Sequence, residues 1–472
     1  MPWFRHFNLQ YNRGAGMAVQ LIVRDGMVVT PQGIRRGHIV VDHGKVVSIA
    51  ERDGDLPEAK EVVDASGRHV LPGLVDPDVK FRDPGLTHKE DWASGSAAAV
   101  CGGICTVIDM PNPAFTVRTA DQARTKLEAA SGKSFCNFGF MASLSQADLG
   151  EIPGLIDAGV CGFRSLYPSS FGDVAMMDAG ELLAAYRIVA ETGYRISVVP
   201  DLHAIIAAAK RQPRPAGQSA YAGWQAARPH EAEVAGVAQA LALASAAGVK
   251  LWLSTIASHE SLPWIRFARD RLGLDLYAET KPHYCVIDGT IMDSQELGSM
   301  LTMLPPVRGL DNADAMLAAL ADGTLDALGT DHSPHTREEK HYDSRMAGVW
   351  QASPGWPGIE TTVPLMLTAV NDGLLTIERY VAVHSEAPAR AWGLWPRKGN
   401  LAHGADADIT IVDLQQHGVI DENSFHSKHR LSPFHGRPFK GKAVMTIIGG
   451  EIVAHDGELA SDKPRGQFVR PE

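Results

Sequence analysis

Short apolar segments and amphipathic segments alternate along the chain from about residue 70 onward. Each pair has the length of one strand followed by one helix, and the pattern repeats eight times. The amphipathic segments 119–132, 180–193 and 231–248 end in glycine, the residue that most readily ends a helix in the left-handed conformation. Eight such units predict a TIM (β/α)8 barrel, an α/β fold. The predicted strands lie at residues 71–81, 104–112, 135–142, 161–167, 195–201, 250–257, 274–284 and 325–335.

Outside this pattern, apolar and polar residues alternate with a period of two at residues 19–50, 407–414 and 442–458. Gly and Asp-Gly interrupt these segments, which predicts antiparallel hairpins. Because neither chain end supplies many strands alone, we expect both ends to form one small β-sandwich into which the barrel is inserted. The predicted domains are an N-terminal extension over residues 1–16, a composite β-sandwich over residues 17–72 and 398–472, and a barrel over residues 73–397.

The composition is typical of a folded protein that binds small molecules or other proteins. The 472 residues are 45% hydrophobic, and the net charge of −11 comes without a basic run, which argues against binding to nucleic acid or an anionic membrane. Five cysteines without CxxC spacing indicate reduced thiols and a cytoplasmic location. No stretch reaches the roughly 18 apolar residues that span a bilayer. Residues 1–16 lack a continuous apolar region, so we interpret them as a loose extension before Met17, itself a candidate start.

A series of motifs runs through the chain in a fixed order. It begins with LPGLVD at residues 71–76 and FRDPGLTHKEDWASGSAAAVCGGICTVIDMPN at residues 81–112. It continues with AETKPHY, MLPPVR, GTDHSPHTREEK, PGIETTVPLMLTAV, GADADITIVDL and SPFHGRPFKG. From about Met17 to the C-terminus, the chain resembles the cyclic amidohydrolases, a family that includes dihydroorotase, allantoinase and hydantoinase. The resemblance implies the barrel and sandwich expected above and hydrolysis of a C–N bond in a cyclic amide. Activity depends on the site itself.

The resemblance also implies a metal site at the C-terminal mouth of the barrel. Family members use one or two divalent metals, which make hydroxide from water and polarise the ring carbonyl. Their ligands are an HxH motif on strand one, a carboxylated lysine on strand four, a histidine each on strands five and six, and an aspartate on strand eight. The corresponding positions in this chain hold Asp78 and Lys80, Arg164, Val199, Thr255 and Asp331.

Most of these residues do not suit a metal. Arg164 stays protonated and cannot form the bridging carbamate of a lysine, and only Asp331 keeps the residue type of the family. His203 and His259 each follow a substituted position by four residues, so a shift in register would restore a histidine. We interpret both as surface or capping residues. The expectation is therefore a degenerate metal site and no cofactor, although the family uses zinc or another divalent metal.

The charged replacements have two interpretations. Asp78 and Lys80 share one face of a strand and should point into the barrel. In the first interpretation, Lys80 and Arg164 pair with the two aspartates in a salt-bridge cluster, because unpaired buried charge costs several kcal/mol. In the second, burial and Arg164 push Lys80 toward neutrality, so that it acts as a base or a Schiff-base nucleophile. The catalytic candidates are then Asp331, Lys80, Asp78 and Arg164.

By resemblance to dihydroorotase, three residues correspond to the group that holds a substrate carboxylate: Arg82, Asn112 and His335. Their geometry would suit a planar anion. The alternative is inheritance, since the FRDPG and DMPN loops also stabilise the mouth of the barrel. We expect loop-packing roles for the other notable side chains of the family-like stretches, which are His88, Trp92, His230 and His283.

The leading hypothesis is a dihydroorotase-like or hydantoinase-like protein that has lost metal-dependent hydrolysis and serves as a structural or regulatory homologue. Inactive dihydroorotase homologues act as scaffolds for pyrimidine-pathway assemblies that include aspartate transcarbamoylase, so the resemblance implies a protein partner. The alternative is a metal-independent enzyme that opens a cyclic amide, imide or ureide. A third interpretation is an ordinary metal hydrolase whose ligands lie elsewhere. We expect a small cyclic carboxylate or ureide ligand and self-association into a homo-oligomer.

Overall fold

The computed structural model describes residues 18–30, 33–165 and 175–472. The expected extension over residues 1–16, the candidate start at Met17 and the end of the fourth expected strand lie outside the described residues. Within the described part of the chain, no helix is long and apolar enough to cross a membrane. The strands are β1 (Val19–Thr30), β2 (Gly33–Asp42), β3 (Lys45–Ala50), β4 (Ala59–Asp64), β5 (His69–Pro72), β6 (Leu74–Val79), β7 (Ile104–Asp109), β8 (Asn137–Phe140), β9 (Ala142–Leu144), β10 (Phe163–Ser165), β11 (Arg195–Val198), β12 (Lys250–Leu253), β13 (Leu276–Thr280), β14 (Ala327–Leu328), β15 (Ile409–Val419), β16 (Pro438–Ile448), β17 (Glu451–His455) and β18 (Glu458–Leu459). The α-helices are α1 (Trp92–Cys101), α2 (Ala120–Ala130), α3 (Ile152–Ala158), α4 (Ala179–Thr192), α5 (His203–Lys210), α6 (Ala220–Ala227), α7 (His230–Ala247), α8 (Leu262–Phe267), α9 (Pro282–Val286), α10 (Leu310–Asp322), α11 (Ile359–Asn371), α12 (Ile377–Val381) and α13 (Ala387–Ala391).

The strands β6 to β14 form a closed parallel barrel. One sheet runs β6-β7-β8, and a second runs β9-β10-β11-β12-β13-β14. Only Met141 separates β8 from β9, so these two strands join the sheets on one side. On the other side, Val79 forms a parallel bridge with His332, and the Lys80 N–H donates to the His332 carbonyl at 2.9 Å. The predicted TIM barrel is therefore confirmed.

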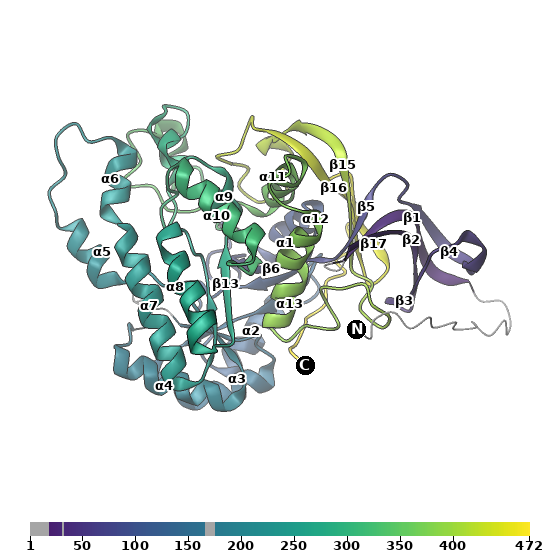
Figure 1. The fold of residues 1–472 in the computed structure, drawn as a ribbon, viewed down its shortest axis with the longest axis horizontal. Helices are drawn as coiled ribbons and strands as arrows, with labels where there is room; N and C mark the ends of the chain where they lie inside the picture. Colours follow the sequence, from purple (N-terminus) through teal and green to yellow (C-terminus); the bar gives the residue numbers. More distant parts are fainter. Residues whose placement is uncertain (1–17, 31–32, 166–174) are drawn as a thin grey trace.

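Helices between the strands cover the outside of the barrel, as α4, α7 and α8 do in Figure 1. Local sequence signals fix their ends. The Thr119 side chain accepts from the N–H of Gln122 and forms a capping box at the start of α2. Gly193 (φ 74°) and Gly248 (φ 69°) end α4 and α7 in the left-handed conformation, which confirms the predicted glycine ends of these two helices.

Strands from both chain ends share one nine-stranded sheet, ordered β18-β17-β16-β15-β5-β1-β2-β3 with β4 paired to β1. β5 joins the two ends, because it is parallel to β1 and antiparallel to β15, where Ile409 pairs with Pro72. The purple and yellow strands lie together beside the barrel in Figure 1. Val23, Val70 and Ile411 belong to their common apolar core. The β-sandwich built from both chain ends is confirmed, whereas the domain boundaries stay a prediction.

Candidate functional site

Charged side chains gather at the C-terminal ends of the barrel strands. Asp78 lies near the end of β6 and Glu279 near the end of β13, while Lys80, Lys281 and Asp331 lie just beyond β6, β13 and β14. All are buried except Lys80, whose side chain is 20% exposed. The loops at this end of a TIM barrel form the active site in barrel enzymes. The charged group therefore occupies the place of an active site.

Lys80 holds two aspartates together across the closing seam of the barrel. Its Nζ donates to Asp78 Oδ1 at 2.8 Å and also to Asp331 Oδ1. Asp331 further accepts from Ser333 Oγ at 3.1 Å. The expected pairing of Lys80 with both aspartates is confirmed, whereas a catalytic role for any of them stays a prediction.

A second lysine, which the sequence analysis did not single out, extends this group. Lys281 Nζ donates to Asp78 Oδ2 at 2.8 Å and to Glu279 Oε1 at 2.6 Å. Glu279 Oε2 also accepts from Ser254 Oγ at 2.8 Å. A signal was present in the sequence, because Glu279 and Lys281 are two residues apart on a strand, as Asp78 and Lys80 are. We refer to Asp78, Lys80, Glu279, Lys281 and Asp331 as the lysine-carboxylate cluster.

Arg164 differs from the expectation. Its Nη1 donates to Ser197 Oγ at 2.6 Å, and it forms no ion pair with Asp78 or Asp331 among the described residues. The reason is register, because Arg164 on β10 lies opposite Ser197 on β11 and the two side chains meet on the same face. Arg164 still lowers the pKa of Asp78 through its charge. The predicted four-residue cluster is therefore wrong in one member. Lys281, and not Arg164, pairs with Asp78 beside Lys80.

The electrostatics favour charged side chains within the cluster. Burial alone would raise the pKa of Asp78, but Lys281, Lys80 and Arg164 lower it far below its ordinary value. Burial alone would lower the pKa of Lys281, but Asp78 and Glu279 raise it above its ordinary value. The charge of Lys80 likewise lowers the pKa of Asp331, against the effect of burial. An ammonium stabilised in this way is a poor base and a poor nucleophile.

The two positions where the family has histidines on strands five and six carry no imidazole. Val199 is half-buried, and Thr255 is buried with its hydroxyl 3.2 Å from Ser254 Oγ. His203 is exposed at the first position of α5. His259 is exposed too, and its Nδ1 lies 3.0 Å from Asn312 Oδ1. Both histidines are surface residues, as expected, and neither reaches the cluster.

Three residues at the mouth adopt the left-handed backbone conformation, which side chains other than glycine rarely adopt: Arg82 (φ 63°), Thr255 (φ 62°) and Asp331 (φ 51°). For a β-branched residue such as Thr255 the conformation is a clear outlier. Strain of this kind persists where the surrounding structure imposes it, and it collects at functional sites. The mouth therefore retains the strained backbone of a functional site.

The three residues matched to the substrate carboxylate have unequal freedom. Asn112 is engaged by its own loop, because its Oδ1 accepts from the Ala114 and Phe115 N–H groups at 3.0 Å each. His335 is engaged as well, with Nε2 3.1 Å from the Pro354 carbonyl and Nδ1 3.3 Å from Lys89 Nζ. Burial, followed by the charges of Arg82 and Lys89, lowers the pKa of His335 to about 3. This imidazole is therefore neutral.

Arg82 is the member of this trio best placed to bind a ligand. Its side chain is buried, and its Nε has no hydrogen-bond partner among the described residues. Burial lowers the pKa of its guanidinium, while the charges of Asp109 and Asp331 act in the opposite direction. A buried donor without a partner costs free energy unless something accepts from it. A role of Arg82 in binding a substrate carboxylate stays a prediction.

The loop-packing roles expected for other side chains fit the structure in two cases. Trp92 is fully buried, and its Nε1 donates to the Asp83 carbonyl at 3.1 Å. His230 Nδ1 lies 2.5 Å from Ser258 Oγ. His283 is buried against Trp356, with its Nε2 lacking a partner within the described part of the chain, and burial lowers its pKa to about 3.

A further buried lysine, Lys340, yields a prediction about pH. Its Nζ donates to Thr302 Oγ1 at 2.8 Å and to the Ser353 carbonyl at 3.0 Å, and burial lowers its pKa from 10.5 to about 7. Between pH 7 and 10 the unfolded chain binds this proton and the folded chain does not, so the group's contribution to the free energy of unfolding rises with pH. Below pH 7 both states are protonated and the contribution is constant.

Lys340→Met should therefore flatten this dependence. Urea unfolding is measured at several pH values from 7 to 9.5. We expect the free energy of unfolding of wild type, relative to that of Lys340→Met, to grow by up to about 1.4 kcal/mol per pH unit. Lys440→Met, at an exposed lysine paired with Asp372, serves as the control and should parallel wild type. Parallel curves for wild type and Lys340→Met would show that Lys340 is protonated when buried.

The barrel, the charged mouth at its C-terminal strand ends and the sandwich from both chain ends define a TIM-barrel protein with charged residues where barrel enzymes have their active site. The model of the amidohydrolase family matches residues 69–453, and the chain belongs to this family. An L-hydantoinase of Paenarthrobacter aurescens is 34% identical over 454 residues, 95% of this chain and 97% of that protein. A dihydroorotase of Methanothermobacter thermautotrophicus is 33% identical over 436 residues, 92% of this chain and 94% of that protein.

A solved structure shows the same fold. The L-hydantoinase (dihydropyrimidinase) from Arthrobacter aurescens superposes with a TM-score of 0.90 at 33% identity, and the match covers 96% of this chain and all of that chain. The resemblance to cyclic amidohydrolases inferred from the motifs is thereby confirmed.

The expectation that no cofactor is needed is wrong. The chain belongs to a family of metal-dependent hydrolases, and Asp25, His38 and Asp53 each offer one ligand atom, all within 4.8 Å of one another. This group lies in the sandwich, and Arg24 Nε is 3.1 Å from Asp25 Oδ2 and 3.3 Å from Asp53 Oδ1. Sequence analysis missed it, because Asp25 and His38 come together only when β1 pairs with β2, and Asp53 joins them from a short 3-10 helix (Asp53–Asp55) after β3.

The mouth of the barrel itself does not fit the family's metals. A metal ligand must offer a lone pair, and neither an ammonium nor a guanidinium has one to offer. Here the Lys80 and Lys281 ammonium groups bind the oxygens of Asp78, Asp331 and Glu279 that a metal would need. A catalytic zinc usually has three protein ligands. We therefore derive no step of a reaction through a metal at this position.

Proposed function

We propose that this chain is a cyclic amidohydrolase homologue that has lost metal-dependent hydrolysis at the barrel mouth and acts as a structural or regulatory protein. The observation that carries the proposal is the lysine-carboxylate cluster. Two ammonium groups bind three buried carboxylates in the place where family members hold metal. The cluster supplies the positive charge that keeps the carboxylates paired, but it supplies no hydroxide.

We further propose that the mouth still binds a small cyclic carboxylate or ureide. Arg82 is buried, and its Nε has no hydrogen-bond partner among the residues described. The negative charge of Asp331, whose backbone is in the left-handed conformation, acts to raise the pKa of the Arg82 guanidinium. The relatives named hydantoinase and dihydroorotase indicate which compounds to test. Binding without turnover would suit a regulatory subunit, in which ligand occupancy changes the affinity for a protein partner.

The scaffold part of the proposal concerns assembly. We propose that the chain forms a homo-oligomer and binds a second protein in a fixed ratio. Purification from its native source under mild conditions would support this if a second protein appears in stoichiometric amount. Recovery of the chain as a homo-oligomer alone would argue against a partner.

A second candidate is metal-independent ring opening by the charged residues of the mouth. It is favoured by one observation, namely that the replaced ligand positions carry Asp78, Lys80 and Arg164 and not small apolar residues alone. The electrostatics oppose it, because Asp78 and Lys281 are held in their charged forms. Turnover that survives a chelator and is lost in Lys80→Met would establish it.

The test of the main proposal is hydrolysis of hydantoin, a 5-substituted hydantoin, allantoin and dihydroorotate, with zinc or manganese supplied. The L-hydantoinase of P. aurescens is assayed in parallel. We expect kcat/KM at least about 1000-fold lower for this chain, a deficit of about 4 kcal/mol in transition-state stabilisation, because no metal hydroxide forms. Turnover within tenfold of that enzyme would overturn the proposal.

Metal analysis locates any bound ion independently of activity. The zinc content per chain is measured for wild type, Asp331→Asn and His38→Ala. We expect Asp331→Asn to match wild type, because the partner of Asp331 is Lys80. A loss of metal specific to Asp331→Asn would place a metal in the mouth and contradict the assignment of the cluster.

A further inference from the structure

We propose that a cavity beside the barrel mouth is a second binding site, for a small organic anion that carries a flat apolar group. The cavity has a volume of about 370 Å³, within the range of small-molecule sites. Its lining comes from α5, α6 and the loops after β13 and β14, and consists of Lys210, Arg214, Trp224, Ala227, Arg228, Leu304, Trp350 and Pro354. This inference goes beyond the function proposed above and does not depend on it.

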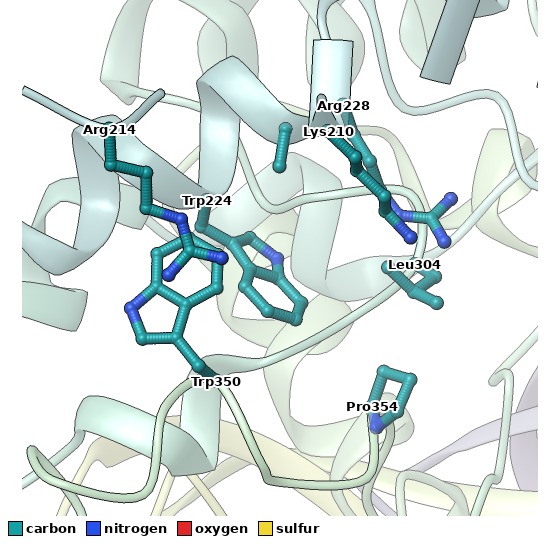
Figure 2. Close-up of a pocket in the computed structure, with 8 residues that line it drawn as sticks. Lys210, Arg214, Trp224, Arg228, Leu304, Trp350 and Pro354 are labelled. Carbon is teal, nitrogen blue, oxygen red and sulfur yellow. The ribbon is translucent and has the colours of Figure 1, made fainter. Parts of the chain in front are cut away.

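The polar part of the lining is cationic. Lys210 and Arg228 extend side by side, and their nitrogens point toward Leu304 (Figure 2). Arg228 pairs with Asp201 at 3.1 Å, whereas Lys210 and Arg214 have no carboxylate partner among the described residues. Both side chains are exposed and carry positive charge in a protein whose net charge is −11. Cations gathered in a hollow against the overall charge raise the local concentration of anions.

The pKa of Lys210 is lowered by its surroundings. Partial burial, followed by repulsion from Arg228, lowers its pKa, and the charge of Asp201 opposes this only in part. A carboxylate or phosphate placed between Lys210 and Arg228 would satisfy both cations with charge-assisted hydrogen bonds. The positive pair thus defines the end of the cavity that receives the anionic group.

The other part of the lining is flat and apolar. The Arg214 guanidinium lies over the Trp350 ring, 3.2 Å from its centroid, as Figure 2 shows. Trp224 and Trp350 have their ring centroids 5.5 Å apart and are tilted by 49°. Trp224 Nε1 already donates to the Met303 carbonyl at 3.3 Å, so that ring offers its apolar face. Two indole rings together with Leu304 and Pro354 fit an aromatic or other planar group.

The cavity shares a wall with the mouth of the barrel. The Pro354 carbonyl lies 3.1 Å from His335 Nε2, and His335 belongs to the trio around Arg82. None of the described residues that line the cavity belongs to the lysine-carboxylate cluster. The two sites differ in their cations, which allows them to be tested separately by substitution.

The experiment is isothermal titration calorimetry of the full chain with phenylacetate, with its neutral isostere phenylacetamide and with inorganic phosphate. We expect phenylacetate to bind at least about tenfold more tightly than phenylacetamide, which lacks the charge, and than phosphate, which lacks the ring. Lys210→Met should weaken phenylacetate about tenfold, as expected for the loss of one charge-assisted contact. Arg211→Gln, at an exposed neighbour outside the lining, should leave the affinity unchanged.

One variant in the apolar part of the cavity and one variant in the mouth of the barrel complete the design. Trp350→Leu should weaken phenylacetate without affecting phosphate, whereas Arg82→Met should leave phenylacetate unchanged. The proposal is overturned if neither anion binds, if phenylacetamide binds as tightly as phenylacetate, or if Lys210→Met retains full affinity. It is equally overturned if Arg82→Met alone abolishes binding, because the anion then lies in the mouth.

Discussion

Lys281→Met should lower the free energy of unfolding by about 3–5 kcal/mol, the cost of leaving a buried ion pair without one partner. Lys281 is fully buried, and its ammonium is the shared partner of Asp78 and Glu279. Methionine fills much of the same volume but cannot donate to either carboxylate. Two charges would then lie buried beside each other, with only Lys80 and the neighbouring hydroxyl groups to compensate them.

Urea unfolding at pH 7 measures this loss. Lys440→Met removes an exposed ammonium paired with Asp372 and should cost less than about 1 kcal/mol. The double variant Lys281→Met, Glu279→Gln should recover part of the loss, because one of the orphaned charges is gone. Equal stability of Lys281→Met and wild type would mean that the cluster does not support the fold.

Gly236→Ala should lower the free energy of unfolding by about 3 kcal/mol, because the added methyl group overpacks a rigid contact. Gly236 lies in α7, and a Cβ there would stand 2.0 Å from the Pro200 carbonyl oxygen, which follows β11. The neighbour is backbone and cannot turn aside. The loss should appear although alanine is the better helix former by about 1 kcal/mol.

The matched control is Gly154→Ala in α3, where the nearest atom, Ala120 Cβ, would lie 3.4 Å away at ordinary contact distance. There the helix preference acts alone, so the variant should be neutral or slightly more stable in the same urea unfolding. If both glycine variants had equal stability, α7 would not be held against the loop after β11 as the structure indicates.

The fold was accessible from the sequence because its signals are local and repeated. Each barrel strand is a short apolar run, and each intervening helix has its own terminal residue, such as Thr119 or Gly193. The period-two pattern of both chain ends likewise predicted their shared sheet. These signals come from the backbone preferences of neighbouring residues, so a single chain displays them.

The site was accessible only in part, because it depends on which strands lie opposite one another. Alternation along a strand placed Asp78 and Lys80 in the lumen, and the structure brings Asp331 to Lys80. The alternation could not show that Ser197 lies opposite Arg164 on the neighbouring strand, or that Lys281 reaches Asp78 from a distant strand. The cationic cavity was missed entirely, since its lining comes from four separate segments with no shared motif.

The pairing of β5 with both β1 and β15 has a consequence for synthesis. When β1 to β5 leave the ribosome, the strand that pairs with Pro72 has not yet been made, because Ile409 lies beyond the whole barrel. At 5–20 residues per second, the barrel takes roughly 17 to 70 seconds to translate. During that time the first strands have one edge unpaired, and such an edge is a template for aggregation. The first segment to be translated is therefore among the last to complete its sheet.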